Sequence, residues 1–211
     1  MMAISPSWTP SSPSAASTET PCGFHSNAFG LPATGPTLLV SGGSQGALSI
    51  NRAVLGARDR LLAEGISVLH VLGIKNMTED TVRAVDPATG AAYVPVPYVA
   101  QMEQAYAAAD LMLGRSGAGT VLETAAVGLP AVFVPYPHGN GEQARNAESV
   151  VKAGGGLLLL DADCTPEWVA SEIPALLHDG ERRQGMAEAL AGVAQTDAAT
   201  VLATRVLEVM G

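Results

Sequence analysis

From residue 36 onward, short apolar runs alternate with longer stretches in which apolar residues recur at helical spacing. Six runs are nearly all apolar, as is typical of strands buried on both faces of a parallel sheet. They cover 37–41, 67–72, 92–95, 111–114, 131–134 and 156–160. The helical patterns cover 47–64, 75–85, 99–108, 119–127, 142–153, 166–177, 181–191 and 198–209.

This alternation predicts an α/β domain, a doubly wound six-stranded parallel sheet of the Rossmann-like type with strand order 3-2-1-4-5-6. In that order the chain reverses direction between the first and fourth strands, and a crevice forms at their carboxyl ends. Glycine-rich loops at 41–47 and 115–120 follow these two strands. We therefore expect both loops at one crevice, with one ligand between them.

The first 35 residues have a different composition from the rest of the chain. They are rich in Ser, Thr and Pro, nearly free of charge, and show no apolar periodicity. Such a segment buries too little surface to offset its ordering entropy. We expect a disordered tail over 1–35, with 24–31 packing on the domain edge, and one domain over 36–211.

Charge and cysteine usage narrow the function classes. A net charge of −9 and a pI near 4.8 argue against nucleic acid as a partner. Cys22 and Cys164 form no metal-binding or disulfide motif, which favours a reducing cytoplasm. No apolar stretch approaches the roughly 20 residues of a membrane span, and no signal peptide is expected. Association with a membrane surface stays open.

Each glycine-rich loop leads from a strand into a helix N-terminus, where backbone amides and the helix dipole favour an anion. The first loop has neither the dinucleotide fingerprint nor the lysine of a Walker A loop. Gly42 and Gly43 allow positive φ and close approach, and Ser44 adds a hydroxyl. A phosphate site and a plain tight turn both fit this loop.

Polar residues in the second loop and beyond it suggest contacts to a nucleotide sugar. Glu123 suits the two hydroxyls of a ribose, or it stabilises its helix dipole. Arg115 either contacts a phosphate or pairs with an acid, and we favour the structural role. Glu142 and Gln143 are able to read sugar hydroxyls, or they cap a helix and face solvent. His138 is a candidate base, although local hydrogen bonding is commoner, and no catalytic arrangement emerges from spacing.

Three strings carry a family resemblance: Arg115-Ser-Gly-Ala-Gly-Thr-Val-Leu-Glu123, Gly128-Leu-Pro-Ala-Val-Phe-Val-Pro135 and Glu142-Gln-Ala-Arg-Asn-Ala147. With Gly42-Gly-Ser-Gln-Gly-Ala47, they resemble the C-terminal half of the MurG family, the UDP-N-acetylglucosamine (UDP-GlcNAc) transferases that make lipid II from lipid I in peptidoglycan synthesis. The resemblance runs from about residue 36 to the C-terminus. It implies one half-domain of a two-domain GT-B fold, the half that binds the donor.

The resemblance implies a role for each matching residue. The two glycine loops would contact the diphosphate, the backbone of Val99 the uracil, Glu123 the ribose, and the pair at 142–143 the GlcNAc hydroxyls. The family has two glutamines there, so Glu142 is a departure that affects sugar specificity. The expected substrate-binding set is Gly43, Ser44, Gln45, Val99, Arg115, Ser116, Ala118, Gly119, Thr120, Glu123, Glu142 and Gln143.

Catalysis in such a site is expected to need no cofactor and no metal, because loop amides and the helix dipole stabilise the departing diphosphate. The one Asp-x-Asp motif, Asp161-Ala162-Asp163, is expected at the sheet edge, away from the crevice. The catalytic residues stay unassigned.

The family's acceptor domain has no counterpart in this sequence, so we expect no transfer by this chain alone. An acceptor-domain subunit is one possible partner, and through it the chain would reach the inner face of the plasma membrane. The alternatives are a donor subunit of a split glycosyltransferase, a non-catalytic nucleotide-sugar binder or regulator, and another GT-B relative such as a UDP-GlcNAc 2-epimerase.

Overall fold

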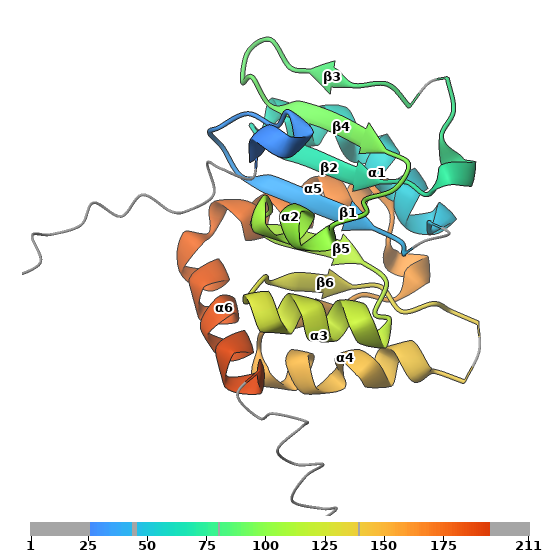
Figure 1. Ribbon diagram of the computed structural model, residues 1–211, viewed down its shortest axis with the longest axis vertical. Helices are drawn as coiled ribbons and strands as arrows, with labels where there is room; N and C mark the ends of the chain where they lie inside the picture. The colour runs from blue at the N-terminus through green and yellow to red at the C-terminus, as the bar shows by residue number, and fades with distance from the viewer. Residues whose placement is uncertain (1–25, 44–45, 80, 139, 195–211) are drawn as a thin grey trace, which may run out of the picture.

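The computed structural model describes residues 26–43, 46–79, 81–138 and 140–194. Seven strands form one sheet in the order β3-β4-β2-β1-β5-β6-β7 (Figure 1). Their bounds are Thr37–Ser41 (β1), Ser67–Val71 (β2), Ala84–Val85 (β3), Ala92–Val96 (β4), Leu111–Gly114 (β5), Ala131–Phe133 (β6) and Gly156–Leu158 (β7). The pairings are parallel except that β3 runs antiparallel to β4 at one edge. The six predicted strands therefore lie in the predicted order.

Helices cover both faces of the sheet. They are Leu48–Ala63 (α1), Met102–Ala107 (α2), Ala118–Val127 (α3), Glu142–Ala153 (α4), Pro166–His178 (α5) and Gly180–Ala194 (α6). Side chains alternate along each strand, so Leu38 and Val40 pack beneath α1 and α5 while Leu39 packs on the side of α2, α3 and α4. Figure 1 shows these two helical layers, with α6 packed beside one end of α3 and α4. The helix expected at 198–209 lies outside the described residues.

The helix predicted over 75–85 is wrong. A short 3-10 turn at Ile74–Asn76 (η3) and the edge strand β3 stand in its place. The Thr81 hydroxyl accepts from the amide of Thr78 at 2.8 Å and donates to the carbonyl of Thr78 at 2.7 Å. This local pairing occupies backbone groups that a helix would need, which is how threonine competes with helix formation. The helix predicted over 99–108 is also shorter, because α2 begins only at Met102.

The first described segment packs against the domain. A 3-10 turn covers Ser26–Phe29 (η2), and Leu31 is buried in the core layer on the side of α2 and α3. Arg83 donates to the carbonyl of Gly30, which ties this segment to the sheet edge near β3. Most of the expected tail lies outside the described residues. Among the residues that are described, none belongs to a helix long and apolar enough to cross a bilayer.

Candidate functional site

The first glycine loop is in close contact with the segment that follows β2. Gly46 has a φ of +73°, and a Cβ there would stand 2.1 Å from the carbonyl oxygen of Leu72. At Gly42 a Cβ would stand 2.3 Å from the amide nitrogen of Ala47, whereas Gly43, with a φ of +81°, has open space around it. Only glycine fits this path. Ser44 and Gln45, two of the predicted phosphate contacts, lie outside the described residues.

The second loop lies beside the first. A Cβ on Gly114 would stand 2.4 Å from the carbonyl oxygen of Ser41, and the amide of Arg115 donates to that oxygen at 3.2 Å. Helix α3 then begins at Ala118 with Gly117 as N-cap and no side-chain cap. Its first amides are left for solvent or for an anion. The expected convergence of the two loops at one crevice is confirmed.

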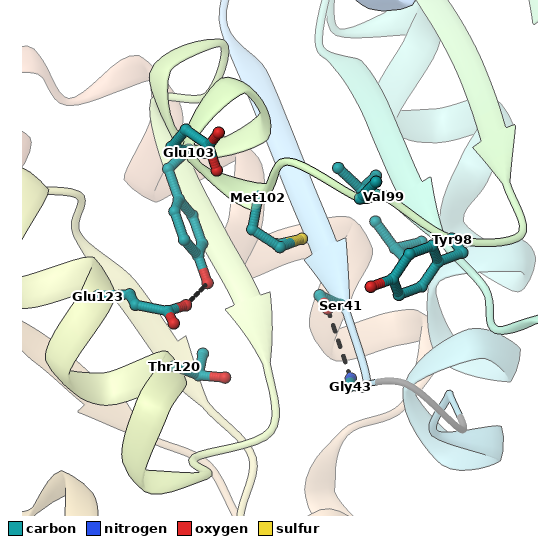
Figure 2. A pocket seen from close by; sticks show the side chains of 11 residues that line it. Ser41, Gly43, Tyr98, Val99, Met102, Glu103, Thr120 and Glu123 are labelled. Atoms are coloured by element: carbon teal, nitrogen blue, oxygen red, sulfur yellow. Dashed lines mark hydrogen bonds between the residues drawn. The ribbon is translucent and has the colours of Figure 1, made fainter.

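Two cavities meet at these loops, and both are lined by Gly43 and Thr120. The first, here called the α2–α3 cavity, has a volume of about 350 Å³ and lies between the β4–α2 connection, α2 and α3 (Figure 2). The second, the glycine-loop cavity, has a volume of about 730 Å³ and reaches from the first loop to the β6–α4 loop. Because they adjoin, one elongated ligand could occupy both.

Glu123 faces the α2–α3 cavity from α3 (Figure 2). Its Oε2 accepts a hydrogen bond from the hydroxyl of Tyr106 at 2.7 Å. Tyr106 is 5% exposed, and burial, reinforced by this bond, raises the pKa of its phenol well above the usual range. The phenol therefore stays a donor, and it fixes one carboxylate oxygen while Glu123 retains further acceptor capacity for a ligand.

Val99, Tyr98 and Met102 form the apolar part of the same cavity. Val99 is buried at the turn before α2. The family resemblance implies that its backbone contacts uracil. Tyr98 is 57% exposed at the rim. The arrangement offers hydrophobic contact on one wall and a carboxylate on the other, which suits a nucleoside.

Arg115 lines the glycine-loop cavity and is held by contacts to three other segments of the chain. Its Nη1 lies 2.5 Å from Oδ1 of Asp161 and donates to the carbonyls of Val134 and Pro135 at 3.1 and 3.0 Å. Its Nη2 donates to the Ser49 hydroxyl at 3.1 Å. The side chain is only 11% exposed. These contacts fit the structural role favoured for Arg115, which is to pair with an acid and hold neighbouring segments together.

The expectation that the Asp-x-Asp motif lies away from the crevice is wrong. Asp161 lines the glycine-loop cavity and accepts from the Ser49 hydroxyl at 2.6 Å. Asp161, which follows β7, supplies the opposite charge that the partly buried Arg115 requires beside it.

The β6–α4 loop carries the next group of predicted residues. Gln143 lines the glycine-loop cavity, and its Oε1 accepts from the amide of Tyr136 at 2.9 Å. Glu142 is exposed and is not one of the residues that line the cavity, so the predicted pair does not face it together. The side chain of Asn140, rather than Glu142, meets the start of α4 by accepting from the Glu142 amide at 3.1 Å. His138 lines the cavity and stands edge-on to Tyr136.

The remaining predicted residues lie near the start of α3. Ser116 is fully buried, and its hydroxyl has no partner among the described residues. Its carbonyl accepts from the Asn146 side chain at 3.1 Å, so Ser116 joins the second loop to α4 and lines neither of the two cavities. Gly119 is exposed, and Ala118 lines a separate cavity between α3, α4 and α6.

Sequence reasoning missed Lys75, Ser49 and Tyr106, which line the two cavities. Lys75 follows the carboxyl end of β2, so the topological rule that placed the two loops would have placed it too. No signal in the sequence pairs Tyr106 with Glu123, because only the packing of α2 against α3 brings them together.

Comparison with known proteins gives a consistent result. The profile of the Glycosyltransferase family 28 C-terminal domain matches residues 37–202. A relative from Cutibacterium acnes, named UDP-N-acetylglucosamine--N-acetylmuramyl-(pentapeptide) pyrophosphoryl-undecaprenol N-acetylglucosamine transferase, is 54% identical over 179 residues, which are 85% of this chain and 48% of that protein. A protein of the same name from Rhodococcus jostii is 52% identical over 183 residues, 86% of this chain and 46% of its own length. The chain spans about half the length of these curated relatives.

Solved structures show the same fold. Acinetobacter baumannii MurG matches with a TM-score of 0.56 and 25% identity over 77% of this chain and 48% of its own. The kitacinnamycin glycotransferase matches with a TM-score of 0.58 and 23% identity, over 82% of this chain and 44% of its own. The expected half-domain of a GT-B glycosyltransferase is thereby confirmed.

Proposed function

This chain belongs to glycosyltransferase family 28, and on that basis we propose that it is the donor-binding domain of an N-acetylglucosaminyltransferase and binds UDP-GlcNAc. The observation that carries the proposal is the junction of two unlike cavities at Gly43 and Thr120. One has an apolar wall and a carboxylate, and the other is bordered by two glycine turns. A nucleoside diphosphate likewise has an apolar base and a ribose diol at one end and negatively charged phosphates at the other.

In this assignment the α2–α3 cavity takes the uridine. The uracil ring contacts Val99 and Met102, and the ribose hydroxyls donate to Glu123. A carboxylate matches a vicinal diol because it offers acceptors at the same spacing. Tyr106 holds that carboxylate in place.

The diphosphate lies over the first glycine loop and the start of α3, where backbone amides and a helix N-terminus favour negative charge. We expect no divalent cation to be needed. Asp161, the acid of the Asp-x-Asp motif that lines this cavity, is paired with Arg115 and hydrogen-bonded to Ser49, which supports this expectation. The loop amides would stabilise the leaving diphosphate during transfer.

The GlcNAc ring then points toward the β6–α4 loop. Gln143 lines the cavity there and keeps its amide NH₂ group for sugar hydroxyls, since only its oxygen is engaged with Tyr136. Glu142 lies beside it, and its contact with the sugar is part of the proposal. His138 borders the same space and is the first candidate for a base on the donor side.

For the whole protein we propose transfer of GlcNAc to a lipid-linked acceptor, as the names of its relatives state for them. We assign this transfer to peptidoglycan synthesis. Transfer requires a base and a surface that position the acceptor hydroxyl. An acceptor-binding partner or domain would supply that surface. We place this reaction in the cytoplasm, at the inner face of the plasma membrane, reached through that partner.

Isothermal titration with UDP-GlcNAc, UDP-glucose and UDP, each with EDTA or with magnesium, tests the donor assignment. We expect all three to bind with EDTA present, and UDP-GlcNAc to bind more tightly than UDP-glucose. Absence of UDP binding would overturn the donor assignment. Binding that EDTA abolishes and magnesium restores would overturn the metal-free part alone.

A further inference from the structure

Under the proposed function, the glycine-loop cavity holds a diphosphate in a protein whose net charge is −9. Among the described residues, two cationic side chains line it, Arg115 and Lys75. Their surroundings differ sharply. Arg115 is the cation that the sequence motif suggests, and Lys75 lies in a segment that the sequence assigned to a helix.

Arg115 has little capacity left for a ligand. Asp161 at 2.5 Å neutralises its charge, and Val134, Pro135 and Ser49 accept further hydrogen bonds from it. Its guanidinium also lies over the ring of Tyr136, 5.5 Å from the ring centre. The pair of Arg115 and Asp161 adds no net charge to the cavity.

Lys75 has the opposite character. It is exposed, and it forms no ion pair with any residue that the structure describes. It is the middle residue of the 3-10 turn η3, between Ile74 and Asn76. Its ammonium is therefore available to a ligand in the cavity that it lines.

The turn that carries Lys75 is fixed against the first glycine loop. A Cβ on Gly46 would stand 2.1 Å from the Leu72 carbonyl oxygen and 2.3 Å from Nδ2 of Asn76, so loop and turn are in direct contact. Asn76 and Asn51 both donate to that same carbonyl, at 2.8 and 3.0 Å. Lys75 is thus held beside the first glycine loop, which lines the same cavity.

We propose that Lys75 is the cation that contacts the donor diphosphate, and that Arg115 serves as a positioning residue for the β6–α4 loop. This inference rests on the proposed function, since it assigns one contact within the donor site. A flexible ammonium supplies a point charge with three donors, which suits a phosphate group at the rim of an open cavity. Charge-assisted hydrogen bonds of this kind are stronger than neutral ones.

The chain offers a matched control, because it contains only two lysines, Lys75 and Lys152. Lys152 is exposed on the last turn of α4 and pairs with Glu148 at 2.5 Å. We would titrate UDP and uridine into the full chain and into the variants Lys75→Met, Lys75→Arg and Lys152→Met. Lys75→Met should weaken UDP binding about tenfold and leave uridine binding unchanged. Lys75→Arg should retain most of the affinity, and Lys152→Met should match the unsubstituted chain.

The outcomes separate this inference from the donor assignment. If the unsubstituted chain binds UDP no better than uridine, the diphosphate assignment fails and the inference fails with it. If UDP binds better than uridine but Lys75→Met keeps that preference, the donor assignment stands and the role of Lys75 is overturned. An equal loss for UDP and uridine would show that Lys75 acts through the shape of the loop, and would also overturn it.

A second measurement does not depend on a substitution that could disturb folding. Reductive methylation with ¹³C-formaldehyde would place an NMR-visible methyl pair on each lysine, and Lys75→Arg would assign the signals. UDP should shift the Lys75 signal and leave the Lys152 signal in place, while uridine should shift neither. A Lys75 signal that ignores saturating UDP would contradict the proposal.

Discussion

The two cavities that meet at Gly43 and Thr120 are built in opposite ways. Among its described lining residues, the α2–α3 cavity has two carboxylates, Glu103 and Glu123, and no lysine or arginine. The glycine-loop cavity has Lys75 and a neutralised pair, Arg115 and Asp161. A ligand with hydroxyl donors at one end and negative charge at the other is therefore oriented in one direction. Electrostatic contrast between neighbouring cavities supplies that orientation.

The two cavities also differ in what shapes them. Side chains form the α2–α3 cavity, with Tyr106 holding Glu123. Backbone forms much of the glycine-loop cavity, where Gly42 and Gly46 allow contacts that no Cβ permits. Substitutions that add a single carbon should damage the second cavity most, and substitutions that remove polar atoms should damage the first.

The largest effect is expected from Gly46→Ala. A Cβ there would meet the Leu72 carbonyl at 2.1 Å, and the φ of +73° adds strain. We expect a loss of about 3 kcal/mol or more in the free energy of unfolding, together with loss of UDP binding. Urea denaturation and titration measure both. Gly43→Ala is the matched control, because its φ is +81° but nothing lies within 4 Å of a Cβ, so it should cost only about 1 kcal/mol. If both variants lose the same free energy of unfolding, the positive φ accounts for the loss and the close contact with Leu72 does not contribute.

The buried network under the Lys75 turn should make that side of the molecule sensitive to acid. His70 is fully buried between Tyr93 at 3.0 Å and Asn51 at 3.1 Å, and burial lowers its pKa to about 3 from the reference value of 6.5. Because the unfolded chain takes up the proton first, the contribution of neutral His70 is complete above about pH 6.5 and is lost as the pH falls toward 3.

From pH 7 to pH 4 we therefore expect the unfolding free energy to fall by about 2–3 kcal/mol more in the unsubstituted chain than in His70→Gln. Urea denaturation at a series of pH values measures the difference. Since Asn51 links His70 to the Leu72 carbonyl, UDP binding should weaken along with stability. If the unfolding free energy falls equally with pH in both proteins, His70 is not the cause of the acid sensitivity.

In the α2–α3 cavity, Glu123→Ala should weaken UDP binding by about 1–3 kcal/mol, the usual effect of losing a charge-assisted hydrogen-bond partner. The loss should be much smaller for a 2′,3′-dideoxyribose analogue of UDP, which has no diol to donate. Calorimetric titration of both ligands measures the contrast. If both lose equally, Glu123 acts through the stability of α3 instead of through the ribose.

The smallest effect is expected from Tyr106→Phe. The ring stays packed, and only the 2.7 Å hydrogen bond to Glu123 is lost. We expect UDP binding to weaken by about 0.5–1.5 kcal/mol, with a matching drop in the preference for ribose over deoxyribose. In the Glu123→Ala background the same change should have no effect on binding. Tyr98→Phe, at the exposed rim of the same cavity, should not alter the preference.

Much of the architecture could be predicted from the sequence because it depends on local patterns. The runs at β1 and β5 have the predicted bounds, as does helix α4. Apolar strands separated by helices permit few topologies, and right-handed crossovers leave the doubly wound order as the natural one. That strand order alone brings the two glycine loops together, and it places Glu123 and Gln143 at the carboxyl edge of the sheet.

Tertiary structure decided the features that depend on contacts between distant segments. The pairing of Arg115 with Asp161 joins residues 46 positions apart, and Tyr106 reaches Glu123 across two helices. Ser116 belongs to the second loop, yet packing against α4 buries its side chain. Lys75 lies in the 3-10 turn η3 and not in the predicted helix, for two reasons. Thr78 and Thr81 form local hydrogen bonds with each other, and the first glycine loop contacts η3 at the end of β2. Periodicity along a chain reports which face of an element is buried, but the partner of each charge depends on which loops meet at the sheet edge.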